Sequence, residues 1–192
     1  GVVHPTKAGL KIPEIFDAAI NKEVKALWII GEDVVQTDPN SAHVVKAMNA
    51  LDLLVVQEIF MSETAKHADV VLPGTTFLEK DGTFTNTERR VQRVNKAAEP
   101  LPGTKPDGVI VTEMMQKLGY NQPIYDADEV LTEIADVVPF FKGITRERLG
   151  KLGLQWPVKE DGTDTTILHE KEFKLGKGRI KYFDWKESSE IA

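Results

Sequence analysis

Three short apolar segments, spaced along the first 73 residues, constrain the fold of this 192-residue chain more than any other feature. The segments are KALWII at 25–30, LLVVQEI at 53–59 and DVVLP at 69–73. Each is short and nearly continuously apolar, which is typical of a strand in a parallel sheet that is covered on both sides. Helix signals stand between them, since Pro13 suits a first helical turn and Asn40-Ser41 can cap a helix. The alternation predicts an α/β fold with a Rossmann-like parallel sheet, flanking helices and right-handed crossovers.

The second half of the sequence departs from this alternation. Asp81-Gly82 lies between two extended segments and predicts a β-hairpin insertion, because glycine readily takes the positive φ that a tight hairpin turn needs. Three helices are then expected between residues 107 and 152, with Asp107 as the cap of the first. We therefore expect an α/β domain over residues 1–152 and an extended C-terminal tail over 153–192.

Composition excludes several classes of function. The formal net charge of -6 argues against a nucleic-acid-binding surface, which needs to be basic, and no apolar run approaches the length of a membrane span. There are no cysteines, so the chain has no disulfide, thiolate nucleophile or cysteine-ligated metal. The four histidines are far apart in sequence, and neither a GxGxxG nor a GxxxxGK[ST] motif is present. We expect no metal-ligating residue within this chain, while a Ser/His/Asp arrangement stays open at this point.

Polar residues follow the predicted strands where each one ends. Gly31-Glu32-Asp33 follows the first strand, Gln57-Glu58 ends the second, and Pro73-Gly74-Thr75 ends the third. Ligands of open parallel sheets bind at this carboxyl edge. A carboxylate there suits the adjacent N1–H and N2–H donors of guanine, and Thr37 or Gln57 could bind ribose or phosphate. Polar strand ends are also common simply because loops are solvated, so both interpretations stay open.

The segment after the predicted turn, TFTNTERRVQ, is dense in polar groups. Lys80 and Asp107 come within reach of the sheet edge only if the hairpin folds back over it. We expect Arg89 and Arg90 to pair with carboxylates or a phosphate, since a guanidinium matches both geometrically. Glu79 and Glu88 are expected to face solvent or to pair with arginine.

Long stretches of the sequence resemble molybdopterin-dependent formate dehydrogenases. The stretches are ALWIIGEDVVQTDPN, LDLLVVQEIFMSETAKHADVVLPGTTFLEKDGTFTNTERRVQRVNKAAEPLPG and GLQWPV. They are similar to the large (alpha) catalytic subunit of the bacterial and archaeal type, from about residue 8 to the end. The resemblance implies that the chain is a middle fragment of such a subunit. It would hold the guanine-nucleotide end of one of two molybdopterin guanine dinucleotide cofactors (bis-MGD), which carry molybdenum or tungsten.

The same resemblance implies a set of cofactor-binding residues. They match the family's G-E-[DN]-x-x-x-[TS] motif, its second strand end, its E-K-x-G turn and the acid that opens the next helix: Gly31, Glu32, Asp33, Thr37, Gln57, Glu58, Lys80 and Asp107. Lys80 would meet phosphate or ribose, while Asn86, Glu88 and Arg89 would lock the hairpin to neighbouring backbone and domains. Gly108 departs from the family, which often has Trp after that acid, and this leaves the packing there open.

The activity implied by the resemblance is the two-electron oxidation of formate to CO2 in the cytoplasm. Electrons would leave through an iron–sulfur cluster in the missing N-terminal part, towards electron-transfer subunits. The isolated chain is expected to be inactive and to bind free cofactor weakly.

Two relatives offer alternatives. The large iron–sulfur subunit of respiratory complex I has a similar EKxGTFxNxExRxQ hairpin, where the domain is a scaffold, and nitrate reductases have an equivalent domain. The G-E-D-x-x-x-T motif together with Gln57-Glu58 and Lys80 favours a retained cofactor pocket. The runs TNTERRVQRV and GLQWPV favour formate dehydrogenase.

Overall fold

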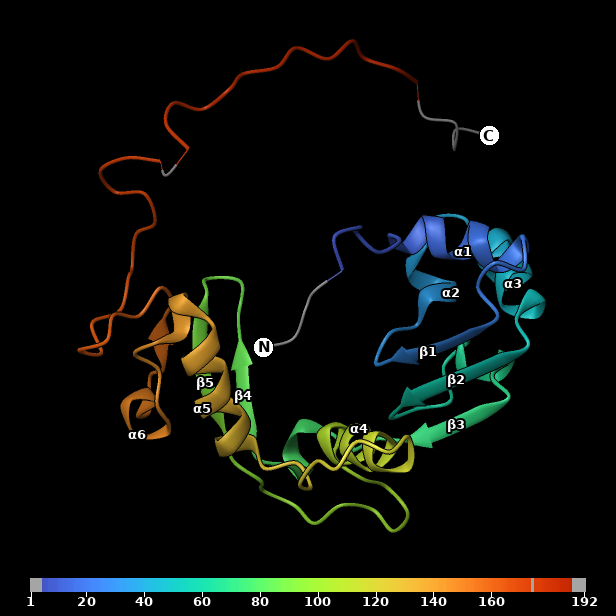
Figure 1. The fold of residues 1–192 in the computed structure, drawn as a ribbon, viewed down its shortest axis with the longest axis horizontal. Helices are drawn as coiled ribbons and strands as arrows, with labels where there is room; N and C mark the ends of the chain where they lie inside the picture. The colour runs from blue at the N-terminus through green and yellow to red at the C-terminus, as the bar shows by residue number, and fades with distance from the viewer. Residues whose placement is uncertain (1–4, 174, 188–192) are drawn as a thin grey trace.

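A computed structural model of the chain describes residues 5–173 and 175–187 (Figure 1). It has two lobes connected along one side and an extended C-terminal segment that arches away from both. The first lobe is built on a parallel sheet of β1 (Ala26–Ile30), β2 (Leu53–Glu58) and β3 (Val70–Pro73), in the order β1-β2-β3. The predicted strands and their parallel arrangement are therefore confirmed.

Three helices pack on one face of this sheet: α1 (Ile12–Ile20), α2 (Val34–Thr37) and α3 (Ser41–Ala50). The Asn40 side chain caps α3 by accepting a hydrogen bond from the backbone N of His43 at 3.2 Å. The first hydrophobic core lies between helices and sheet, and includes Phe16, Ala19, Val44, Met48, Leu54 and Val56. Each large apolar side chain buried there contributes about 1.5–3 kcal/mol.

The opposite face of the sheet is largely open in this chain. Ile30, Leu53 and Val70 are 46%, 42% and 42% exposed. The prediction that the strands are covered on both sides therefore holds for one face only. On the other face the segment that begins at Asp107 covers Gln57 and leaves these three residues exposed. Residues alternate between the faces along a strand, so Gln57 points away from the core that holds Leu54 and Val56.

The second lobe is built on an antiparallel sheet. Strands β4 (Gly82–Thr85) and β5 (Arg90–Val94) form a hairpin, and β6 (Leu154–Gln155) pairs with β5. Helices α5 (Ala127–Val137) and α6 (Arg146–Leu149) pack on it around a second core. The core residues are Val91, Leu131, Ile144, Leu149 and Val158. Single turns of 3-10 helix complete the two lobes: η1 (Ala65–His67), η2 (Phe77–Glu79) and η3 (Pro139–Phe141).

The hairpin is confirmed, but the prediction of its turn at Asp81-Gly82 is wrong. The chain reverses at residues 86–89 instead, where the Asn86 side-chain oxygen accepts hydrogen bonds from the backbone N of Glu88 at 3.1 Å and of Arg90 at 2.9 Å. Arg89 takes a φ of +68° to close the turn. Before Asp81 the chain forms η2 rather than a strand, so Asp-Gly has no second strand to connect.

Arg89 and Arg90 use their guanidinium groups differently. Arg90 pairs with Glu88 through Nε at 2.8 Å, as predicted. Arg89 donates to the carbonyl oxygens of Trp156, Thr165 and Thr166, the last two at 3.1 Å. The prediction that Arg89 pairs with a carboxylate or phosphate is therefore wrong, whereas its predicted role in locking the hairpin to neighbouring backbone is confirmed.

Residues beyond 152 first belong to the second lobe and then leave it. Leu154–Gln155 form β6, and Val158 is buried in the second core. Among the described residues after 158, no helix or strand is formed. The division into a domain over 1–152 and a tail over 153–192 stays a prediction. In the part of the chain that the structure describes, no helix is long and apolar enough to cross a membrane.

The Arg89 contacts generate a prediction about stability. Arg89→Ala removes charged hydrogen bonds to three carbonyls, so we expect the free energy of unfolding to fall by about 2 kcal/mol. Arg93→Ala is the matched control, because Arg93 is an exposed residue of β5, the strand that follows Arg89. Urea unfolding followed by circular dichroism measures both. Equal stability of the two variants would contradict the role given to Arg89.

Candidate functional site

The Asp107 carboxylate lies where the parallel sheet, the segment before β4 and helix α4 (Asp107–Lys117) meet. Its Oδ1 accepts a hydrogen bond from Gln57 Nε2 at 2.8 Å. Its Oδ2 forms an ion pair with Lys80 Nζ. Gln57 is 1% exposed, whereas the side chains of Lys80 and Asp107 are 25% and 41% exposed. The sequence-predicted residues Gln57, Lys80 and Asp107 are thus brought into direct contact.

The backbone around Asp107 explains this close approach. Gly74, just after β3, pairs with Lys105, and the backbone N of Lys105 donates to the Pro73 carbonyl at 3.2 Å. A Cβ at Gly74 would lie 3.1 Å from Asp107 Oδ1, tighter than most side-chain contacts. Asp107 is the first residue of α4, after Pro106 at the N-cap, so it does not cap the helix as predicted. A carboxylate in a first turn is favoured by the helix dipole.

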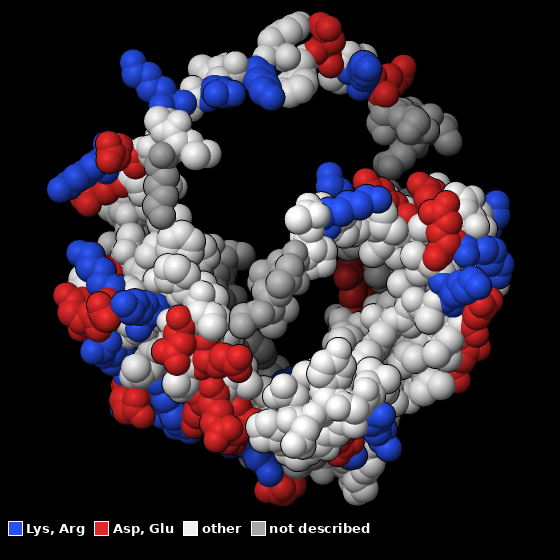
Figure 2. Space-filling view, viewed as in Figure 1, with Lys and Arg blue, Asp and Glu red and all other residues white. Residues whose placement is uncertain are grey.

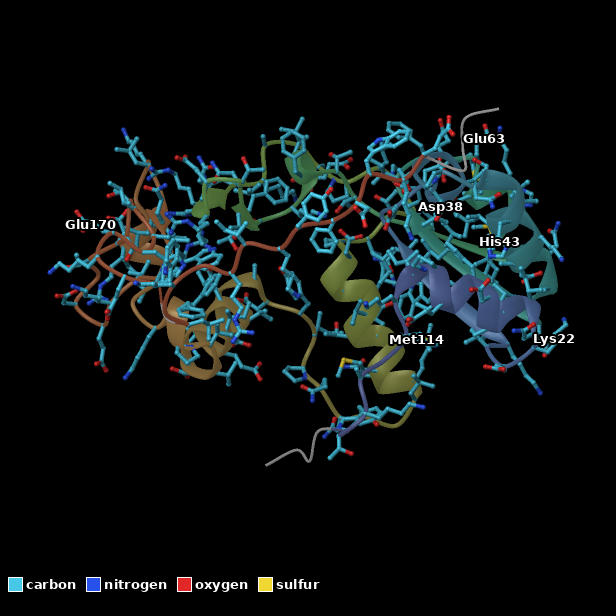
Figure 3. The ribbon with its side chains drawn as sticks, turned by 90° about the horizontal axis from the view of Figure 1, so that it is seen from above. Lys22, Asp38, His43, Glu63, Met114 and Glu170 are labelled. Atoms are coloured by element: carbon cyan, nitrogen blue, oxygen red, sulfur yellow. The ribbon has the colours of Figure 1, made fainter. Side chains whose placement is uncertain are left out.

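Asp107 is placed in the molecule between the two lobes. Figure 3 shows α4, marked by Met114, with the parallel-sheet lobe on one side, marked by His43, and the second lobe on the other, marked by Glu170. In Figure 2, Asp and Glu side chains gather over the second lobe, while the adjoining surface over α4 carries few charges.

The environment of Asp107 keeps its carboxyl ionised. Burial by itself would raise the pKa of Asp107, but the hydrogen bonds from Lys80 and Gln57 and the charge of Lys80 outweigh burial. The pKa of Asp107 consequently lies below its ordinary value of 3.8. At neutral pH the site presents a fixed carboxylate next to an ammonium group.

A pocket of about 210 Å³ opens beside this ion pair. Its lining includes Lys80, Asp81, Phe84, Asp107, Gly108 and Tyr125. One side of the pocket is charged and the other carries two aromatic rings. Such a mixture suits a ligand that is flat and apolar on its faces and polar at its edge.

Two buried oxygens near the sheet edge have no hydrogen-bond partner among the described residues. They are Gln57 Oε1 and Thr75 Oγ1. An unpaired buried polar atom costs about 1–3 kcal/mol, and such atoms are rare in folded proteins. Together with the Lys80–Asp107 pair, they concentrate unpaired acceptors and one cation near this edge of the sheet.

The first strand end is arranged differently. Asp33 Oδ1 accepts from the backbone N and the hydroxyl of Thr64, at 2.9 and 2.6 Å, and Oδ2 accepts from the backbone N of Glu63 at 3.2 Å. Burial raises the pKa of Asp33, but these bonds more than offset it and leave the pKa lowered. Asp33 thus ties the loop after β1 to the loop after β2.

The remaining predicted residues lie at the same edge with freer side chains. Gly31 takes a φ of +64°, and its N donates to the Gln57 carbonyl at 2.9 Å, which joins the two strand ends. Thr37 donates to Glu32 Oε1 at 3.3 Å, and both residues are exposed on one side of the edge. Glu58 Oε1 accepts only a local bond, from the backbone N of Ile59 at 2.7 Å.

Sequence reasoning missed three residues of this region. Thr64 binds Asp33, Thr75 is buried at the third strand end, and Tyr125 lines the pocket. Thr75 lies in the predicted strand end Pro73-Gly74-Thr75, but no pattern in the sequence pairs residue 64 with 33 or places residue 125 beside 107. Among the residues that the structure describes, no group of three or more His, Asp and Glu could hold a metal ion.

Comparisons with known proteins show the family to which the chain is similar. Residues 3–117, more than half of the chain, match the family described as molybdopterin oxidoreductase. The chain is 44% identical over 189 residues to the F420-dependent formate dehydrogenase subunit alpha of Methanocaldococcus jannaschii. It is 44% identical over 188 residues to the F420-dependent formate dehydrogenase 2 subunit alpha of Methanococcus maripaludis. These matches cover 96% and 95% of the chain but 28% of each relative, so the chain spans just over a quarter of their length.

A solved structure gives the same fold. Acetylene hydratase from Pelobacter acetylenicus matches with a TM-score of 0.59 and 24% sequence identity. The match covers 70% of this chain and 19% of that one. At this level of identity it supports the α/β fold and nothing further.

The depressed pKa of Asp107 generates a prediction about acid stability. Its stabilising contribution is present above the ordinary value of 3.8 and is lost as pH falls through the lower value of the folded state. We expect the unfolding free energy of the wild type to fall with acidification more steeply than that of Asp107→Asn.

Urea unfolding at a series of pH values from about 6 to about 3 measures this difference. Asp136→Asn, a change on α5, is the matched control and should keep the slope of the wild type. An unchanged slope in Asp107→Asn would contradict the ion pair with Lys80.

Proposed function

Because the chain belongs to the molybdopterin oxidoreductase family, we propose that it forms part of a formate dehydrogenase alpha subunit and holds the guanine-nucleotide end of a molybdopterin guanine dinucleotide. The Asp107 carboxylate, fixed between Gln57 and Lys80 at the carboxyl edge of the sheet, is the observation that carries this proposal. The edge of an open parallel sheet is where ligands of such folds bind.

The chemistry of Asp107 fits guanine. An ionised carboxylate offers about four lone-pair sites on its two oxygens. Gln57 and Lys80 use one site each, which leaves acceptors for the N1–H and N2–H donors of the base. Lys80 keeps the carboxylate charged, and charged acceptors form the stronger hydrogen bonds. Adenine lacks this pair of donors, so the site should select guanine.

The other predicted residues serve the remaining parts of the nucleotide. Lys80 supplies positive charge for phosphate or ribose oxygens, and Glu32, Thr37 and Glu58 offer exposed oxygens to ribose hydroxyls. At Gly31, which has no side chain, the end of the first strand lies directly against the end of the second. Asp33, whose oxygens already bind the loop after β2, acts on the site by positioning that loop.

The cofactor, when bound, supplies a molybdenum or tungsten centre that takes two electrons from formate as CO2 forms. The residues of this chain bind and orient the nucleotide and make no bond to formate, so the chain by itself oxidises no formate. The two relatives are named as alpha subunits, which supports partner subunits in the whole enzyme. We propose that these are electron-transfer subunits and that an iron–sulfur cluster lies elsewhere in the enzyme. Their names favour formate dehydrogenase over a nitrate reductase or a complex I scaffold.

A binding measurement tests the proposal. We expect the 192-residue chain to bind GDP more tightly than ADP in NMR titrations, and we expect Asp107→Asn to lose this preference. The loss should be about tenfold, since charged hydrogen bonds contribute about 1.5–3 kcal/mol each. Glu113→Gln is the control, because Glu113 lies on the same helix and pairs with Lys105. Equal affinity of the wild type for GDP and ADP would overturn the role of Asp107.

A further inference from the structure

Tyr125 lines the pocket beside Asp107. Its ring packs directly on Gly108, the residue after Asp107. A Cβ at position 108 would lie 2.6 Å from Tyr125 Cε2, and closer still to Cγ and Cδ2. Real Cβ atoms do not approach other atoms so closely, so the ring takes this position only because residue 108 is glycine.

The backbone of Tyr125 is anchored to α4, and its phenol group lies near β4. Its backbone N donates to the hydroxyl of Thr112 on α4 at 3.2 Å. The next residue, Asp126, caps α5 by accepting from the backbone N of Asp128 and Glu129 at 2.9 and 3.0 Å. At the other end, the phenol oxygen lies 3.9 Å from where a Cβ would stand on Gly82 at the start of β4. The side chain therefore reaches from α4 to β4 along the pocket.

The surroundings keep this ring neutral. Burial raises the pKa of the Tyr125 phenol, and the carboxylates of Asp126, Asp107 and Asp128 raise it further. The pocket thus combines an uncharged aromatic surface with the Lys80–Asp107 pair. A planar base can place its edge against a carboxylate and its face against a ring at the same time.

We propose that Tyr125 is a nucleotide-contacting residue of this site, whose ring packs against the face of the base that Asp107 holds by its edge, and that Gly108 is glycine to admit this ring. The inference rests on the proposed function. It makes the connection between α4 and α5 part of the nucleotide pocket. None of the predicted site residues belongs to this connection.

Substitutions of Tyr125 test the aromatic contact, with GDP as the probe in NMR titrations of the 192-residue chain. We expect Tyr125→Ala to weaken GDP binding about tenfold, which is typical of removing a ring stacked on a base, and Tyr125→Phe to bind as the wild type does. Tyr120→Ala is the matched control, since Tyr120 lies on the same connection and is 62% exposed. Tyr125→Leu keeps the bulk without the ring and decides the question if Tyr125→Ala does not fold.

Gly108→Ala tests the other half of the proposal. The added methyl group displaces the Tyr125 ring, so the variant should lose GDP affinity to the same degree as Tyr125→Ala. The double variant Gly108→Ala/Tyr125→Ala should bind no more weakly than either single variant, because both changes remove one contact. Its thermal midpoint should exceed that of Gly108→Ala, because the steric conflict is gone.

The outcomes separate this inference from the proposed function. If the wild type binds GDP and folded Tyr125→Ala or Tyr125→Leu binds it equally well, the contact is overturned while the proposed function stands. If the wild type binds no GDP, both fail. Additive losses in the double variant would show that Gly108 acts independently of Tyr125 and would overturn the pairing.

Discussion

The structure depends on one partly buried junction, the Asp107 carboxylate between the amide of Gln57 and the ammonium of Lys80. It connects the end of β2, the segment that enters the hairpin and the first turn of α4. Residues 50 and 27 positions apart in sequence are thereby fixed at one point. Removing one partner would leave a partly buried charge or amide group without a hydrogen-bond partner. The free-energy cost of that change exceeds the net stabilisation that the intact pair provides. The same arrangement gives the sheet edge its charge and its acceptors.

The two lobes next to this junction are stabilised by different kinds of interaction. The parallel lobe has a core in which α1, α2 and α3 cover one face of the sheet. The second lobe has a small core and relies on polar ties to a distant segment, chiefly Arg89 to the carbonyls of Trp156 and Thr165. Helix α4 lies between them (Figure 1). The pocket beside Asp107 takes its charged side from the junction and its aromatic side from Phe84 and Tyr125 of the second lobe and its connection.

Local patterns sufficed to predict the elements and the sheet edge, because apolar runs and caps act within a few residues. The predictions for β1, β2 and α3 depended on such runs and on the Asn40 cap, and all three are confirmed. The turn at Asp81-Gly82 was wrong because Asn86 closes a reversal at 86–89 and the segment before Asp81 forms η2. The partner of Arg89 was wrong because its carbonyl acceptors lie 67 or more positions away. Tyr125 could not be predicted, since its place depends on the glycine at 108 and on the path of the α4–α5 connection.

The central claim, that the junction at Asp107 receives a guanine nucleotide, is tested most directly at the side chain of Gln57. Its Nε2 group donates to Asp107 and gives its own pair of signals in a ¹⁵N NMR spectrum. During a titration of the 192-residue chain with GDP, these signals and the backbone signal of Asp107 should shift together and saturate at one common concentration. Shifts confined to the second lobe, with the Gln57 side-chain signals unmoved at saturation, would contradict the claim.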